Sequence, residues 1–118
     1  MDKLDAVFER QRALAANFIP IAELEKGDLP RDKHLLTYIS LLIEETVELQ
    51  RTINSRKFWR AKIGARPINM EEFRDELADV LHIVVAIALI AGLSPEDLFN
   101  DYVRKNEINK QRVIDDAS

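Results

Sequence analysis

The spacing of apolar residues along the chain follows a helical period in its first half. Two segments, residues 2–18 and 30–54, carry apolar residues every three or four positions, which places them on one face of a helix. No segment alternates with the period of two that a half-buried strand requires. The predicted core positions are Leu4, Val7, Phe8, Leu14, Ala15 and Phe18 in the first helix, and Leu35, Ile39, Leu42, Thr46, Leu49 and Ile53 in the second.

A loop and a cap separate the second helix from a third. Residues 55–68 are predicted to form the loop, because glycine and proline interrupt the helical pattern there. Asn69, followed three residues later by Glu72, has the pattern of an N-terminal cap. The third helix then continues to Gly92, which is a typical helix stop.

The third helix is apolar on every side between Ile83 and Ala91. Such a helix needs cover all round, and a symmetric dimer or tetramer is the simplest way to provide it. A fourth helix begins at the cap Ser94 and is expected to bury a stripe of Leu98, Phe99 and Tyr102. The predicted architecture is all-α, with residues 1–118 forming one four-helix bundle domain that oligomerisation completes.

Composition narrows the class of protein. The 118 residues are 47% hydrophobic and 32% charged, as in an ordered globular chain. The absence of cysteine and of an apolar signal core near the N-terminus favours a cytoplasmic protein. A net charge of −4 argues against nucleic acid as the main partner, and no apolar run is long enough to predict a membrane span.

Two pairs of acidic residues interrupt the apolar faces. Glu45 and Glu48 lie in the second predicted helix, and Glu76 and Asp79 lie in the third. Residues three apart share a helix face, so two facing helices would bring four carboxylates together. Such a cluster would repel itself without a cation. Oxygen ligands without cysteine favour Mg²⁺ or Mn²⁺.

Another metal site is less consistent with the spacing. A ferritin-like di-iron centre uses Glu-x-x-His on two helices, and the nearest match here is Asp79 with His82. His82 is expected to be a core or boundary residue that points away from Glu76. A single acidic pair is commonly a solvated helix face, but the recurrence of the pattern favours the hard-cation site.

Basic and amide side chains are candidates for binding an anion and a base. The stretch 51–66 has six basic residues and no acid, so it is either a solvated loop or an anion site. Gln11 interrupts the apolar face of the first helix, and Asn106 and Asn109 interrupt that of the fourth, flanked by Lys105 and Arg112. A buried amide must find a partner, which is either the backbone or a base edge.

The motifs resemble one known family. "EETVE" at 44–48 and "DELAD" at 75–79 resemble the E-E-x-x-E and E-x-x-D motifs of the all-α NTP pyrophosphatases, the superfamily of MazG-like proteins and dimeric dUTPases. "FERQ" at 8–11, "KFW" at 57–59 and "KNEIN" at 105–109 are similar to the dUTPase branch. After Arg112 the chain departs from that branch, so the base stays open.

The resemblance implies a Mg²⁺-dependent hydrolase that converts a nucleoside triphosphate to the monophosphate and pyrophosphate. It implies four metal ligands, Glu45, Glu48, Glu76 and Asp79, with Glu44 beside Glu45 assisting the attacking water. Candidate contacts to phosphate, ribose or base are Gln11, Lys57, Trp59, Lys105, Asn106, Asn109 and Arg112. The alternatives are a helical module that binds nucleic acid, which leaves the inward-facing acids unexplained, and a structural or partner-binding bundle.

Overall fold

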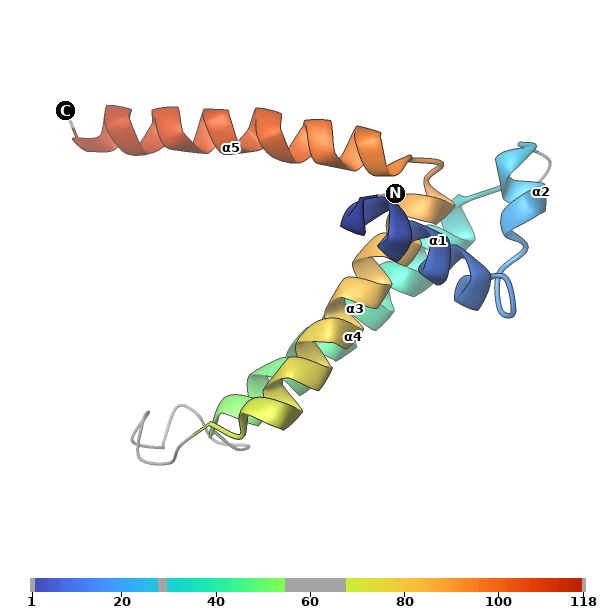
Figure 1. Ribbon diagram of the computed structural model, residues 1–118, viewed down its shortest axis with the longest axis horizontal. Helices are drawn as coiled ribbons and strands as arrows, with labels where there is room; N and C mark the ends of the chain where they lie inside the picture. Colours follow the sequence, from blue (N-terminus) through green and yellow to red (C-terminus); the bar gives the residue numbers. More distant parts are fainter. Residues whose placement is uncertain (1, 28–29, 55–67, 118) are drawn as a thin grey trace.

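The computed structural model describes residues 2–27, 30–54 and 68–117, and these residues form helices and no strands (Figure 1). The all-α prediction is therefore confirmed. The four predicted helices are all present, and the structure adds the short α2, which sequence reasoning missed because it has only five residues. The elements are α1 (Lys3–Ala15), α2 (Ile21–Glu25), α3 (Asp32–Asn54), α4 (Met70–Ile90) and α5 (Pro95–Ala117).

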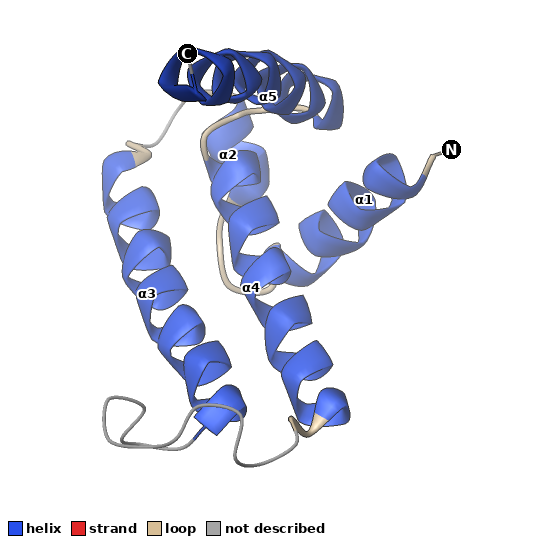
Figure 2. Cartoon of the chain, turned by 90° about the vertical axis from the view of Figure 1, so that its left-hand side faces the viewer, coloured by secondary structure: helices blue, strands red, loops and turns tan. Residues whose placement is uncertain are grey.

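The central unit is the antiparallel pair of α3 and α4, which make the most extensive contact between elements (Figures 1 and 2). Asn69 begins α4, since its side-chain oxygen accepts a hydrogen bond from the Glu72 backbone N–H at 3.1 Å. This is the predicted cap. At the opposite end of the pair, α1 packs against α4, and α2 lies beside the C-terminal part of α4.

The buried core lies at the C-terminal end of α4, where α1 and α2 cover it. Ile19, Ile21 and Leu24 pack with Ile90 in one cluster. In the other cluster, Phe8 packs with Val85 and Ala88 of α4. Within one chain, α1 and α2 bury part of the apolar segment of α4 and leave the rest half-buried, so the expectation of an oligomer stays a prediction. The buried residues of α4 are Val85, Ala86, Ala88 and Ile90.

Several predicted core positions are exposed in the chain. In α1, Leu14 is 47% exposed, and Phe18 lies beyond the end of the helix and is 75% exposed. In α5, Phe99 is 56% and Tyr102 67% exposed, so the predicted buried stripe of that helix is open. In α3 the exposed members of the predicted face are Ile39, Thr46 and Ile53.

A sharp turn joins α4 to α5. Gly92 has a φ of 83°, a conformation that favours glycine, and the Leu93 N–H bonds to the Ala88 carbonyl as in a Schellman motif. Ser94 and Asp97 then cap α5 reciprocally, with bonds of 2.9 and 3.0 Å between backbone and side chain. Hydrogen bonds from the Ser94 backbone and hydroxyl lower the pKa of the Asp97 carboxyl. Both sequence signals, the stop and the cap, are confirmed.

The turn sends α5 away from the central pair. The chain bends by 109° between α4 and α5, and α5 extends beyond the other helices (Figure 1). Within the described residues, no single helix is long and apolar enough to cross a membrane, although α4 and α5 pass that test as a bent pair. In this chain, α5 packs chiefly against α1.

Arg31 fastens the ends of two helices together. Its Nη1 donates to the Ala91 carbonyl of α4 at 3.1 Å, and its Nη2 donates to the Leu24 carbonyl of α2 at 3.0 Å. A Cβ added at Gly92 would meet Arg31 Nη1 at 3.0 Å, so this clamp closes tightly over the turn. Carbonyls at a helix end lack intrahelical partners, and the guanidinium supplies them.

Replacing Arg31 with alanine is expected to lower the free energy of unfolding by about 2 kcal/mol, because two carbonyls at helix ends lose a charged donor. Urea unfolding followed by circular dichroism measures the change. Lys33→Ala, at an exposed position in the first turn of α3, is the control and should alter stability by under about 0.5 kcal/mol. Equal losses in both variants would show that the Arg31 bonds contribute nothing specific.

Candidate metal centre and nucleotide pocket

Three of the predicted acids meet between α3 and α4. Glu45 comes from α3, and Glu76 and Asp79 come from α4, where they lie one turn apart. One carboxylate oxygen from each lies within 4.8 Å of the other two. Glu45 and Glu76 are partly buried and Asp79 is exposed, so the cluster opens to solvent on one side.

The geometry of these oxygens suits a hard cation. Two oxygens bound to one Mg²⁺ at about 2.0–2.1 Å lie at most about 4.2 Å apart. A small inward movement of the three side chains would therefore close them around one ion. Three carboxylates from the protein leave positions for water and phosphate oxygens, which is the usual pattern of Mg²⁺ sites that act on nucleotides.

The electrostatics of Glu76 show how closely the acids are gathered. Partial burial raises the pKa of the Glu76 carboxyl above its ordinary value, because the charged form loses hydration. Like charge raises it further, in decreasing order of effect from Asp79, Glu45, Glu48 and Glu72. Glu72 was assigned only to the helix cap, although its position four residues before Glu76 could have placed it beside the cluster.

The remaining acids of α3 differ in their surroundings. Glu48 is close enough to raise the Glu76 pKa, but its Oε1 also accepts a hydrogen bond from Arg51 at 3.1 Å. It lies outside the set of three oxygens, so a role as a fourth ligand requires it to leave Arg51. Glu44 precedes Glu45 on the exposed side of α3. The structure brings Glu45, Glu76 and Asp79 together and leaves Glu44 beside them in sequence.

A pocket of about 370 Å³ lies between α1 and α4, and we call it the α1–α4 pocket. Its volume is in the range of small-molecule sites. Ala78, Leu81 and His82 form its α4 wall, and none of the three clustered acids is among its lining residues. The lining residues are Val7, Arg10, Gln11, Leu14, Ala78, Leu81 and His82.

Gln11 is the buried polar residue of this pocket. Its side chain is 7% exposed, and within the described ranges no hydrogen bond reaches its amide. A buried amide without a partner is costly, by about 1–3 kcal/mol, unless a ligand satisfies it. Within the described part of the chain, the backbone therefore does not provide the partner that the buried Gln11 amide needs.

His82 was expected in the core or at its boundary, but it is exposed and lines the α1–α4 pocket beside Gln11. Its Nδ1 lies 2.8 Å from the Ala78 carbonyl oxygen. Because that oxygen can only accept, the neutral ring donates from Nδ1 and keeps Nε2 as an acceptor. The sequence signal that could have found it is its spacing of three residues from Asp79.

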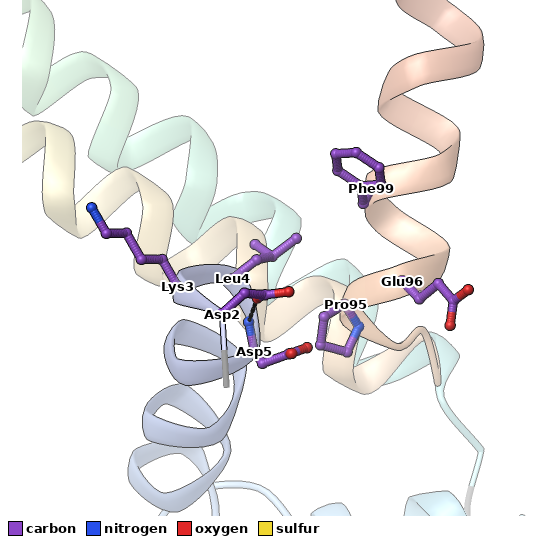
Figure 3. A pocket seen from close by; sticks show the side chains of 7 residues that line it. All are labelled: Asp2, Lys3, Leu4, Asp5, Pro95, Glu96 and Phe99. Carbon is purple, nitrogen blue, oxygen red and sulfur yellow. Dashed lines mark hydrogen bonds between the residues drawn. The ribbon is translucent and has the colours of Figure 1, made fainter.

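A second hollow, of about 410 Å³, lies where α5 begins beside the start of α1 (Figure 3). Asp2, Asp5 and Glu96 lie on its rim with Lys3, and Phe99 stands over it from α5 (Figure 3). Three carboxylates against one amine disfavour a triphosphate there. The α1–α4 pocket is the better candidate for a nucleotide.

The other predicted substrate residues are not gathered around the acids. Lys105, Asn106, Asn109 and Arg112 lie on α5, which runs away from the α3–α4 pair in Figure 1. Asn106 is partly buried, and the other three are exposed. Lys57 and Trp59, like most of the basic stretch 51–66, lie outside the described residues.

Comparison with known protein families shows which family this chain belongs to. The family model for the MazG nucleotide pyrophosphohydrolase domain matches residues 33–114, which is more than half of the chain. The chain belongs to this family. No curated protein and no solved structure gives a significant match.

The matched range includes some of the candidate site residues of this MazG domain and excludes others. It contains the whole acidic cluster and most of α5, whereas Gln11 and the rest of α1 lie before it. Nucleotide pyrophosphohydrolase activity is therefore supported for the domain as a class. Divalent-metal dependence is typical of MazG enzymes, and the three gathered carboxylates provide a suitable donor set.

The Glu76→Gln variant of the MazG domain should be more stable than the wild type at neutral pH without metal. The raised pKa means that folding favours the protonated carboxyl, so wild-type stability falls as pH rises from the ordinary glutamate value through the raised one. The glutamine side chain carries no charge, so the substitution should remove that decrease. Urea midpoints measured between pH 4 and 8 in EDTA test this.

The control for this pH series is Glu9→Gln, which removes an exposed carboxylate from α1. Its pH profile should follow that of the wild type. A Glu76→Gln profile that also follows the wild type would contradict the clustering of charge around this residue.

Proposed function

We propose that this MazG domain is a Mg²⁺-dependent nucleoside triphosphate pyrophosphohydrolase that releases the monophosphate and pyrophosphate, with Mn²⁺ able to replace Mg²⁺. The observation that carries the proposal is the meeting of Glu45, Glu76 and Asp79 within 4.8 Å between α3 and α4. The family match supports the same class of reaction. A site without cysteine or an evident nucleophilic pair suits attack by water.

In this proposal the carboxylates of Glu45, Glu76 and Asp79 hold the cation, and Glu48 joins them on release from Arg51. When bound, the cation supplies positive charge to the phosphate oxygens and lowers the pKa of a coordinated water. Glu44 accepts a proton from the attacking water. The water oxygen bonds to the α-phosphorus as the α–β phosphoanhydride bond breaks, and the electron pair leaves with pyrophosphate.

The α1–α4 pocket is the proposed site of the base. Gln11 offers a donor and an acceptor from one amide, and His82 offers an acceptor at Nε2. Arg10 and four apolar side chains complete the lining, and a largely apolar wall is usual for a small-molecule pocket. None of the three acids lines the pocket, so in this proposal the phosphates extend from the base around α4 to reach them.

An isotope experiment tests the reaction itself. Hydrolysis of a panel of canonical nucleoside triphosphates and dUTP in H₂¹⁸O with Mg²⁺ should place the label in the monophosphate and none in pyrophosphate. Release of inorganic phosphate, or label in pyrophosphate, would contradict attack at the α-phosphorus. The absence of turnover across the panel would favour a module that binds nucleic acid or a partner protein.

Asp79→Asn and Glu45→Gln should each lower kcat by on the order of 100- to 1000-fold, because each removes a ligand charge that stabilises the transition state. Calorimetric titration with Mn²⁺ should show weaker binding in both variants. Glu9→Gln is the control and should keep wild-type turnover. Wild-type kinetics in either ligand variant at limiting Mg²⁺ would overturn the assignment of that ligand.

Gln11→Leu should narrow the ratio of kcat/KM between preferred and rejected nucleotides by about ten- to a hundred-fold, because paired hydrogen bonds to the base are lost. The substituted protein should also be at least as stable as the wild type, since an unpartnered buried amide is removed. Gln111→Leu makes the same change on an exposed face of α5 and should leave selectivity alone. An equal loss for every nucleotide would make Gln11 a packing residue.

A further inference from the structure

The acids between α3 and α4 carry more negative charge than one divalent cation offsets. Partial burial raises the pKa of Glu76, and so does the charge of four further carboxylates, those of Asp79, Glu45, Glu48 and Glu72. A triphosphate that binds there brings additional negative charge. Sites that hold transferring phosphates use cationic side chains together with the metal to stabilise this charge. A cationic side chain is therefore needed within reach of the cluster.

Helices α3 and α4, which lie wholly within the described residues, hold three lysine and arginine side chains. Lys33 lies twelve residues before Glu45, which is about 18 Å along α3. Arg74 lines an apolar groove of α4, and it faces away from Glu76 because residues two apart on a helix do not share a face. The third is Arg51, which pairs with Glu48.

The pair between Arg51 and Glu48 occupies an acid that the metal site needs. The Nη1 of Arg51 donates a hydrogen bond to Glu48 Oε1 at 3.1 Å, and the two side chains are 59% and 51% exposed. Exposed pairs one turn apart on a helix contribute little to stability. Glu48 lies outside the set of three gathered oxygens. The pair can therefore separate at small cost when Glu48 turns to a different cation.

The released guanidinium would stay beside the phosphates. A carboxylate is attracted more strongly to a doubly charged ion than to a singly charged guanidinium at the same distance. Two oxygens bound to one Mg²⁺ lie at most about 4.2 Å apart, so a phosphate oxygen on the ion that binds Glu48 would lie next to that carboxylate. Arg51, which contacts Glu48 in the metal-free chain, would reach such an oxygen by a change of rotamer.

We propose that Arg51 exchanges one anionic partner for another: it pairs with Glu48 in the metal-free protein, and it binds an oxygen of the substrate triphosphate once Glu48 joins the other acids on the cation. The inference rests on the proposed function for its cation and its substrate. A guanidinium suits both partners, because its planar set of donors matches carboxylate and phosphate oxygens alike. Arg51 then neutralises Glu48 in the empty site and phosphate in the filled one.

Two calorimetric titrations of the Arg51→Gln protein test the exchange without using turnover. Mn²⁺ should bind about two- to five-fold more tightly than to the wild type, because no guanidinium competes for Glu48. Inorganic triphosphate, added as its manganese complex, should bind the manganese-loaded variant about ten- to a hundred-fold more weakly, because a charged donor to phosphate is lost. One substitution should therefore change two affinities in opposite directions.

Three further variants separate the exchange from a general effect of charge. Arg74→Gln removes the same charge from α4 and should leave both affinities within about two-fold of the wild type at physiological ionic strength. In a Glu48→Gln background, Arg51→Gln should no longer tighten Mn²⁺ binding, because the carboxylate for which the two cations compete is gone. Arg51→Lys keeps the charge and should bind triphosphate within about tenfold of the wild type.

The outcomes that would overturn the exchange are distinct from failure of the proposed function. An unchanged affinity for Mn²⁺ or for triphosphate in Arg51→Gln overturns it, because the exchange requires both affinities to change. Tighter Mn²⁺ binding that persists in the Glu48→Gln background also overturns it, since the effect would then not depend on Glu48. If the titrations agree with expectation and the wild type hydrolyses no nucleotide, the proposed function fails and the exchange stands.

Discussion

Repulsion among the acids between α3 and α4 is the constraint on which the rest of the structure depends. Partial burial and, beyond it, several nearby carboxylates raise the pKa of Glu76, so the metal-free chain holds like charges that favour separation of the two helices. Apolar packing at the far end of the pair opposes this, where α1 and α2 enclose the last turns of α4. The helices are therefore fastened at one end and electrostatically strained nearer the other.

The separation of the packed core from the acidic cluster suits a site that binds a cation reversibly. Burial of Val85, Ala86 and Ile90 stabilises the fold without help from the acids, and the Arg31 clamp fixes the turn into α5. A cation that neutralises Glu45, Glu76 and Asp79 would add to that stability by mass action. In the metal-free protein, apolar packing opposes the repulsion among the acids. In the metal-bound protein, the cation would neutralise that repulsion.

Local chemistry explains which parts of the fold could be predicted. The stop at Gly92 and the caps at Asn69 and Ser94 depend on neighbouring residues alone, so their sequence signals sufficed. The meeting of Glu45 with Glu76 and Asp79 followed from helical spacing together with the pairing of two long helices. The burial of Gln11 could be predicted for the same reason, because this residue interrupts an apolar helix face.

The predictions that the structure does not bear out have a different physical cause. Phe99 and Tyr102 were expected to be buried because the pattern shows which face is apolar but not which chain covers it. The contribution of α2 to covering the end of the Ile83–Ala91 segment was missed, because sequence spacing did not reveal so short a helix. The position of His82 depended on the direction from which α1 crosses α4, which its own neighbours do not determine.

Anomalous diffraction tests the metal site most directly, from crystals grown with Mn²⁺ and an α,β-imido nucleoside triphosphate, which cannot be cleaved at the reacting bond. We expect a manganese peak bound by Glu45, Glu76 and Asp79, with the α-phosphate beside it and the base in the α1–α4 pocket. A nucleotide bound elsewhere, with no manganese between α3 and α4, would contradict it.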